Sequence, residues 1–217
     1  AGVLLCDDYL WDLHYLNVTS DGMGGAVVSC VSNNGVLHLQ RVNALGIALW
    51  DTPGDNAFGL VMTGAAVEVL SYWSALASPG GGDAIVTWQD QRKGASDIDI
   101  YAQRVDSSGA TLWDSAGVGV CTVSENQRQP VIEPDGLGGV FIVWEDARTG
   151  GYYLYAQRLD ENGDALWASD GVPVSAVQNQ YKRAPVIAPD GAGGAIIAWN
   201  DLRPGDTTYW NVYAQKV

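Results

Sequence analysis

The sequence has 217 residues, with 25 acidic against 11 basic side chains, and 47% of its residues are hydrophobic. The formal charge of −14 excludes nucleic acid as a partner, because phosphate binding requires a basic surface, and it argues against docking on an anionic membrane. The apolar content excludes a disordered chain, and no apolar run approaches the roughly 20 residues of a spanning helix, so no membrane insertion is expected.

In chain order, the first predicted feature is a repeat. A glycine-rich turn is followed by a run of apolar β-formers and a tryptophan, and in the first copy a cysteine stands in the place of the tryptophan. The four copies occupy residues 24–30, 82–94, 138–150 and 193–205. Two further blocks follow in register, one typified by Tyr-Ala-Gln-Arg and the other by Leu-Trp. They occupy 38–41, 101–104, 155–158 and 213–216, and then 48–50, 111–113 and 165–167. A spacing of about 55 residues indicates a repeat architecture.

The third repeat shows the elements of one unit. It predicts a short strand at 130–133, a β-branched and aromatic strand at 139–144 and an alternating strand at 152–159. The Asn-Gly pair in 160–163 predicts a hairpin turn, after which 164–167 is expected to begin a fourth, outer strand. Four antiparallel strands in each repeat are typical of a β-propeller blade.

The sequence therefore predicts an all-β fold, a β-propeller with about four blades of four antiparallel strands. A single domain is expected over 1–217, with repeats at about 2–53, 54–116, 117–170 and 171–217. Two arrangements are open. Residues 2–6 can pair beside 211–217 and close a four-bladed ring, or further blades from the same or another chain can continue a larger propeller. Both ends fall within a repeat, which favours continuation.

A resemblance supports this fold. The pattern Asp-Gly-x-Gly-Gly-Ala-x-x-x-Trp-x-Asp-x-Arg-x-Gly, followed by Ile-Tyr-Ala-Gln-Arg and Gly-x-x-Leu-Trp, resembles the β-propeller repeats of large secreted or surface-exposed bacterial proteins. It covers nearly the whole chain and is weakest in the first repeat. The resemblance implies an extracellular or cell-surface location more than it implies an activity. The chain lacks the Ser-x-Asp-x-Gly-x-Thr-Trp box of sialidase-type propellers.

Most of the distinctive residues recur, which favours a structural role. We expect a structural role for the tryptophans at the two repeated positions and for the aspartates that follow the first of them. These residues are Trp88, Trp144, Trp199, Trp50, Trp113, Trp167, Asp90, Asp146 and Asp201. Candidate binding residues are the arginines of the Asp-x-Arg pairs, whose guanidinium forks suit carboxylates or sugar hydroxyls, and the three tryptophans outside the repeated positions. They are Arg92, Arg148, Arg203, Trp11, Trp73 and Trp210.

The sequence predicts no catalytic residue, metal ligand or cofactor. Cys6, Cys30 and Cys121 are expected to be small buried apolar residues, because no Cys/His cluster exists. Residues 160–164 resemble the first ligand positions of a calcium loop, but the glycine and glutamate that such a loop needs are missing. Calcium binding is therefore possible but is not supported by a motif. Glu133 and Glu145 share one repeat and are an unsupported carboxylate pair.

The favoured hypothesis is a non-enzymatic binding or structural module of a secreted or surface protein, with a carbohydrate or protein partner. One alternative is a carbohydrate-active enzyme, a glycoside hydrolase or lyase that uses the funnel of the propeller. Another is an architectural subunit of an extracellular assembly.

Overall fold

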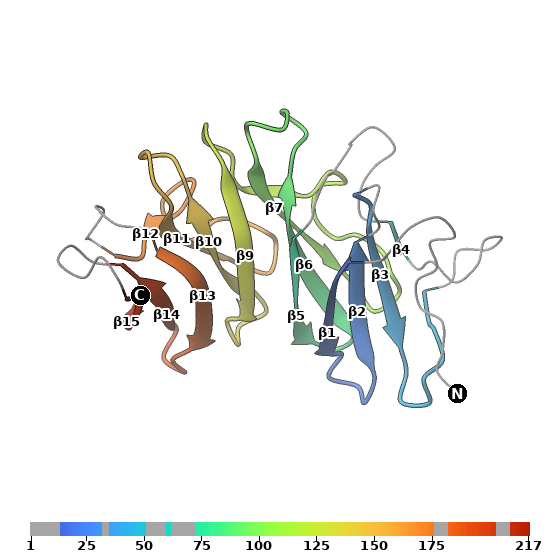
Figure 1. Ribbon diagram of the computed structural model, residues 1–217. Coiled ribbons are helices and arrows are strands. Elements are labelled where there is room, and N and C mark those ends of the chain that lie inside the picture. The colour runs from blue at the N-terminus through green and yellow to red at the C-terminus, as the bar shows by residue number, and fades with distance from the viewer. Residues whose placement is uncertain (1–13, 32–34, 51–59, 62–72, 176–181, 203–208) are drawn as a thin grey trace.

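The computed structural model describes residues 14–31, 35–50, 60–61, 73–175, 182–202 and 209–217. These residues form fifteen β-strands and no helix. The strands assemble into four antiparallel sheets (Figure 1). The expected all-β fold is therefore confirmed for the described part of the chain.

In every sheet the strands follow one another in chain order, so each sheet is a simple meander. The first sheet contains β1 (His14–Ser20), β2 (Ala26–Val31), β3 (Leu37–Val42) and β4 (Leu60–Val61). The second contains β5 (Ser74–Gly80), β6 (Asp83–Asp90), β7 (Asp99–Val105) and β8 (Val118–Cys121). The third contains β9 (Gln127–Pro134), β10 (Val140–Asp146), β11 (Tyr153–Leu159) and β12 (Val172–Pro173). The fourth contains β13 (Lys182–Pro189), β14 (Ala195–Asp201) and β15 (Asn211–Lys216).

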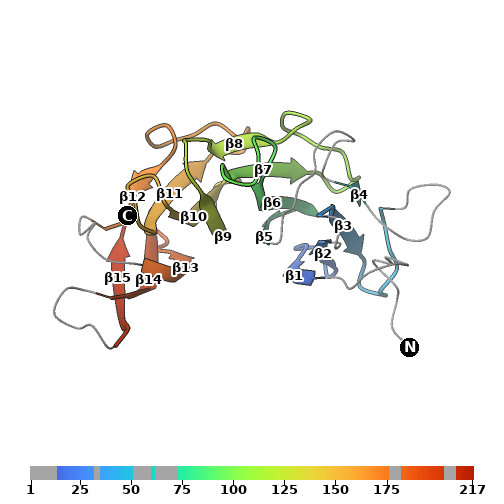
Figure 2. The same cartoon turned by 45° about the horizontal axis from the view of Figure 1, so that its top comes forward.

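The sheets stand side by side in an arc (Figure 2). The first strands of the four sheets, β1, β5, β9 and β13, lie on the concave side, where each contacts the next. The outer strands β4, β8 and β12 lie on the convex side. This radial arrangement of antiparallel meanders, three of them four-stranded in the described part of the chain, is that of a β-propeller, as the repeats predict.

Short-range hydrogen bonds explain why the first, third and fourth sheets turn back between their first and second strands. In the turn between β9 and β10, the Asp135 carboxylate accepts hydrogen bonds from the backbone amides of Leu137 (2.8 Å) and Gly139 (2.9 Å). Such an Asx turn offers the backbone a partner at the point where it leaves the strand. Asp21 and Asp190 form the same turn in the first and fourth sheets.

The hydrophobic core consists of three layers, each between two neighbouring sheets. The repeated tryptophans of the second strands face the preceding sheet and are buried, with exposed fractions of 1% for Trp88, 0% for Trp144 and 3% for Trp199. Trp50 is also buried at 3%, whereas Trp113 and Trp167 are partly buried. The first three tryptophans are therefore buried between neighbouring sheets. Since β10 contacts a sheet on each side, all its side chains are buried.

The sheets do not begin where the sequence repeats were expected to begin. β8 and β12 lie at the start of the third and fourth expected repeats, yet they complete the second and third sheets. The outer strand expected from residue 164 is wrong, because 164–167 contribute only an isolated bridge between Ala165 and Leu159. The reason is a side chain: the Gln157 amide bonds the backbone of Trp167 and Ala168 in place of a strand partner.

The described part of the fourth sheet has three strands, and no fourth strand there pairs with β15. Residues 2–6, which were expected to pair beside it, lie outside the described residues, so ring closure and continuation both stay predictions. Among the described residues, no helix is long and apolar enough to cross a membrane.

Candidate functional site

The Trp-x-Asp-x-Arg motif forms a closed network at the end of β10. Asp146 accepts hydrogen bonds from the indole Nε1 of Trp144 (2.8 Å) and from both Nε (2.9 Å) and Nη2 (2.6 Å) of Arg148. The guanidinium of Arg148 lies 3.9 Å from the centre of the Tyr155 ring, and Nη2 also donates to the carbonyl of Asp170 (2.8 Å). These partners come from the same sheet or from the segment leading to its outer strand, and one further contact, 3.0 Å from Nη2 to the Cys121 sulfur of β8, reaches the second sheet.

The second sheet repeats this network almost atom for atom. Asp90 binds the Trp88 indole at 2.9 Å and both Nε and Nη2 of Arg92 at 2.8 and 2.6 Å. Arg92 stacks 3.7 Å over Tyr101 and donates to the carbonyl of Ala116. Such bidentate pairs brace the connection between the second and third strands. A ligand-binding role for these two arginines stays a prediction.

The fourth sheet keeps the first half of the network, because Trp199 Nε1 donates to Asp201 at 3.1 Å. Arg203, which was expected to continue it, lies outside the described residues, as does the candidate stacking residue Trp11. Trp73, just before β5, is partly buried. Trp210, just before β15, is 37% exposed and carries the Arg183 guanidinium 3.9 Å over its ring.

A second polar cluster lies in the connection between β6 and β7. The Asp99 carboxylate is fully buried, and Lys93 Nζ lies 3.2 Å from its Oδ1 and 3.1 Å from its Oδ2. Nζ also donates to the carbonyl of Thr122 at 2.7 Å. Within the described residues, Asp97 Oδ1 is a buried oxygen that no hydrogen bond satisfies, whereas Asp99 Oδ2 is partnered only by the Lys93 ammonium of the ion pair. A buried acceptor without a donor is unusual, and it calls for an explanation.

Burial also shifts the pKa of Asp99. Desolvation is the largest influence on Asp99 and raises its pKa. The Lys93 ammonium opposes this effect, whereas the neighbouring Asp97 and Asp90 carboxylates reinforce it. A carboxyl group whose pKa is raised in this way can hold a proton closer to neutral pH and can therefore act as an acid.

The cluster extends to the third sheet. The backbone amide of Gln127, the first residue of β9, donates to the carbonyl of Ile98 at 2.7 Å, and the buried Gln127 Oε1 has no hydrogen-bond partner in the described part of the chain. We call Lys93, Asp97, Asp99 and Gln127 the acidic junction. It lies at the end of the second and third sheets where β7 and β9 begin.

The sequence analysis missed the acidic junction, although a signal for it exists. Asp99 pairs with Asp90 across β6 and β7, and the equivalent positions are Tyr153 in the third sheet and Asn211 in the fourth. The aspartate is thus an ionisable residue that departs from the repeat. Residues that recur in every repeat are the ones that build each sheet. The residues of a single active site occur only once and do not stand out in a repeat pattern.

Glu145, by contrast, has a structural explanation. Its Oε1 accepts the backbone amide of Ala184 and its Oε2 accepts Arg128 Nε, both at 3.0 Å. Gln89 accepts the amide of Gln129 in the same way one sheet earlier. These side chains hold a β-bulge in the first strand of the next sheet. Glu133 is partly buried, and its burial raises its pKa.

The two cysteines of the described residues differ in state: Cys121 is a free thiol and Cys30 is disulfide-bonded. Cys121 is a free, buried thiol whose pKa burial raises to about 12, and Arg148 Nη2 lies 3.0 Å from its sulfur. Cys30 is disulfide-bonded, so the expectation that it is only a small apolar residue is wrong. No group of three or more His, Cys, Asp or Glu in the described part of the chain is placed to hold a metal ion.

No protein family model matches the sequence, and no curated protein matches it either. Solved structures do share its fold. The GH93 α-L-arabinofuranosidase of Fusarium graminearum, solved with arabinobiose, has a TM-score of 0.60 at 12% identity over 98% of this chain. The chain spans 65% of the length of that enzyme.

Two other enzymes show a similar likeness. The endo-arabinase of Bacteroides thetaiotaomicron VPI-5482 has a TM-score of 0.50 at 14% identity, over 93% of this chain and 74% of its own. The sucrose-6-phosphate hydrolase of Lactobacillus gasseri has a TM-score of 0.52 at 12% identity, over 87% of this chain and 40% of its own. The architecture is thus the β-propeller found in glycoside hydrolases.

The hypothesis of a non-enzymatic binding or structural module is contradicted by these neighbours, which are carbohydrate-active enzymes. The alternative of a carbohydrate-active enzyme agrees better with them. The physical reason for the error is that a strong repeat pattern identifies the residues that build each sheet. Catalytic residues occur only once on such a fold, so the repeat pattern does not reveal them.

Proposed function

We propose that the chain is part of a glycoside hydrolase that acts on arabinofuranose-containing glycans. The observation that carries the proposal is the acidic junction: a pair of carboxylates, present once among repeated sheets, on a fold that arabinan-cleaving enzymes share. Glycoside hydrolysis uses two carboxyl groups, one as acid and one as base or nucleophile. Fold likeness at 12–14% identity supports the architecture, and the junction supports the chemistry.

In this proposal Asp99 is the acid, because burial raises its pKa, and it donates a proton to the departing glycosidic oxygen. Asp97 is the second carboxylate. Lys93, which is 39% exposed, closes over Asp99 and moves aside when a sugar enters. The unsatisfied Gln127 Oε1 accepts a hydrogen bond from a sugar hydroxyl.

The test compares release of reducing sugar from arabinan and from an aryl α-L-arabinofuranoside by four proteins. These are the parent chain, Asp99→Asn, Asp97→Asn and Glu161→Gln. Either aspartate variant should lose roughly 10²-fold or more, as expected for general acid–base groups. Glu161 is exposed and follows β11 at the opposite end of the sheets, so Glu161→Gln should keep full activity.

Two outcomes would contradict the proposal. One is a folded parent protein that cleaves none of a panel of arabinofuranosides, pyranosides and fructofuranosides. The other is a folded Asp99→Asn protein with parental activity, which would remove Asp99 from the chemistry. Circular dichroism of each variant separates loss of fold from loss of function.

An extracellular location is part of the proposal. The disulfide at Cys30 and the net charge of −14 support it, because disulfides persist in oxidising compartments and a strongly acidic chain remains soluble there. A glycan is the proposed partner.

A further inference from the structure

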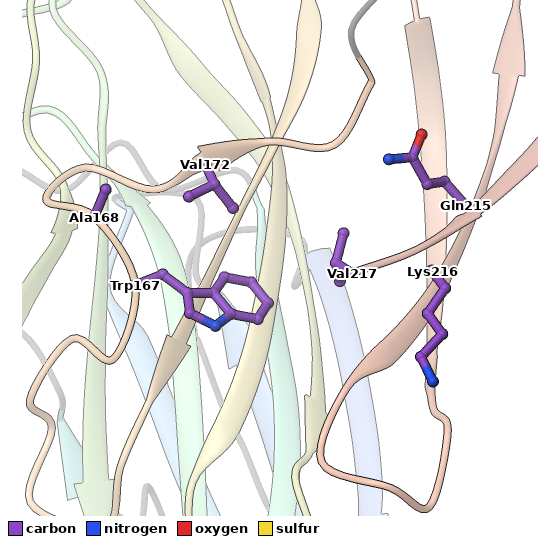
Figure 3. Close-up of a pocket in the computed structure, with 6 residues that line it drawn as sticks. All are labelled: Trp167, Ala168, Val172, Gln215, Lys216 and Val217. Atoms are coloured by element: carbon purple, nitrogen blue, oxygen red, sulfur yellow. The ribbon is translucent and has the colours of Figure 1, made fainter.

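A groove of about 450 Å³ lies between the third and fourth sheets (Figure 3). Its lining residues are Trp167, Ala168, Val172, Gln215, Lys216 and Val217. The Trp167 ring forms one wall, and the C-terminal half of β15 forms the other. This volume is in the range of ligand pockets, so the groove is large enough to bind a ligand or a segment of polypeptide.

In the two preceding interfaces the equivalent position is filled by a turn of the next sheet. Gly109 lies against Trp50 so closely that a Cβ on it would come within 3.1 Å of the ring. Gly163 lies against Trp113 in the same way, at 2.9 Å. The indole Nε1 of Trp50 donates to the carbonyl of Ser107, two residues before Gly109, at 3.1 Å.

The same turns share one sequence type and one hydrogen-bond pattern. An Asn or Asp at the first position accepts backbone amides two and four residues later, and Leu-Trp follows the glycine. The turns occupy 43–46, 106–109 and 160–163. We call this sequence type the Asx-x-x-Gly-x-x-Leu-Trp turn.

A glutamine clamps the segment after each turn. Gln103 Oε1 accepts the amide of Trp113 (3.0 Å), and its Nε2 donates to the carbonyl of Asp114 (2.6 Å). Gln157 makes the same pair of bonds in the third sheet, and Gln40 in the first sheet accepts the Trp50 amide and donates to the carbonyl of Trp50 itself. The corresponding residue of the fourth sheet is Gln215.

At the groove these contacts are missing. In the described part of the chain, neither the Trp167 indole N–H nor the Gln215 amide has a hydrogen-bond partner, and Gln215 is exposed. Arg158 bonds the carbonyl of Gly193, whereas its counterpart Arg104 bonds both Gly138 and the turn carbonyl of Glu161. The Trp167 indole and the Gln215 amide therefore lack the partners of their counterparts, and Arg158 lacks the bond to a turn carbonyl that Arg104 makes.

We propose that the groove binds an Asx-x-x-Gly-x-x-Leu-Trp turn of polypeptide placed at the end of β15. The glycine lies on the Trp167 ring, a turn carbonyl accepts the Trp167 and Arg158 donors, and Gln215 clamps the backbone beyond. The two filled interfaces favour this occupant over a saccharide. A polypeptide segment offers a backbone amide to the Gln215 side-chain oxygen and a backbone carbonyl to its side-chain nitrogen, as in the preceding sheets. This inference is independent of the proposed function.

The test extends the chain after Val217 with Asp-Glu-Asn-Gly-Asp-Ala-Leu-Trp, the sequence of 160–167. The matched control carries valine in place of the appended glycine. Nuclear magnetic resonance follows the Trp167 indole N–H, assigned with Trp167→Phe. The glycine extension should shift this resonance and slow its hydrogen exchange by roughly fivefold or more, as one added hydrogen bond would. The valine extension should do neither.

Gln215→Ala supplies a second, independent readout. It should leave the thermal midpoint of the parent chain unchanged, because Gln215 has no partner there, and should lower that of the glycine-extended chain. Equal behaviour of the glycine and valine extensions would overturn the proposal. So would a shift of the Trp167 resonance by arabinobiose added to the parent chain, because the groove would then be a saccharide site.

Discussion

The indole Nε1 of Trp113 donates a 3.1 Å hydrogen bond to the carbonyl oxygen of Glu161, in the turn that follows β11 of the next sheet. Arg104 reaches the same carbonyl at 3.1 Å and Gly138 at 3.2 Å. The sheets are therefore joined by directed polar contacts as well as by apolar layers. Stability in such a stack depends on the interfaces between neighbours.

Trp144→Ala should lower the free energy of unfolding by about 3–5 kcal/mol, because it removes a fully buried ring from the layer between the second and third sheets. Urea denaturation measures the change. Trp210→Ala, at a site that is 37% exposed, is the control and should cost much less. Parental denaturation of Trp144→Ala would refute the assignment of this ring to the core.

Arg148→Ala should lower the free energy of unfolding by roughly 2–4 kcal/mol, because it leaves the buried Asp146 carboxylate without its cation. Arg148→Lys should recover only part of the loss, since an ammonium cannot reproduce the bidentate pair. Glycan affinity, measured by calorimetry, should be unchanged. If a fully folded Arg148→Ala protein lost affinity selectively, the arginine would belong to a binding site.

Gly171→Ala and Gly191→Ala separate steric contact from backbone strain. Both glycines have positive φ, +84° and +74°. A Cβ at Gly171 would lie 2.4 Å from the Trp144 ring and 2.8 Å from the Ala156 carbonyl, whereas Gly191 has nothing within 4 Å. Gly191→Ala should cost about 1–2 kcal/mol and Gly171→Ala roughly 1–3 kcal/mol more, as judged by urea denaturation. Equal costs would show that the Trp144 contact is unimportant.

Stability should fall as the pH is lowered below about 4. Burial of Asp135 opposes its ionisation, but hydrogen bonds from Leu137, Arg158 and Gly139 outweigh it and hold its pKa below the ordinary value. A group with a lowered folded pKa stabilises the fold above its unfolded pKa, and this stabilisation is lost as the pH falls through the folded pKa. Urea denaturation between pH 5 and 2 should show a smaller decline for Asp135→Asn. An identical decline in both proteins would contradict this cause.

The sheets could be predicted because the strand pattern around Trp144 recurs along the chain. Such a repeat is visible in one sequence. The outer strands were not predictable in the same way. Their position depends on Gln157, whose side chain replaces a strand partner for Trp167, and sequence pattern carries no sign of that exchange.

The candidate site was harder to predict than the fold. Asp99 looks like an ordinary turn residue in the sequence, and it becomes unusual only because the fold buries it. Its burial depends on contacts between segments far apart in the chain, such as the bond between Ile98 and Gln127. A search for ionisable residues that break the repeat would have selected it.

The Cys121 thiol can report how often the interface between the second and third sheets opens. This thiol is buried between the second and third sheets, and a pKa of about 12 keeps it protonated, so the folded protein should be inert to alkylating reagents. Reaction requires β8 to detach or the two sheets to part. The rate at which a maleimide or iodoacetamide consumes this thiol therefore measures how often one particular interface of the propeller opens, while the rest of the chain stays folded.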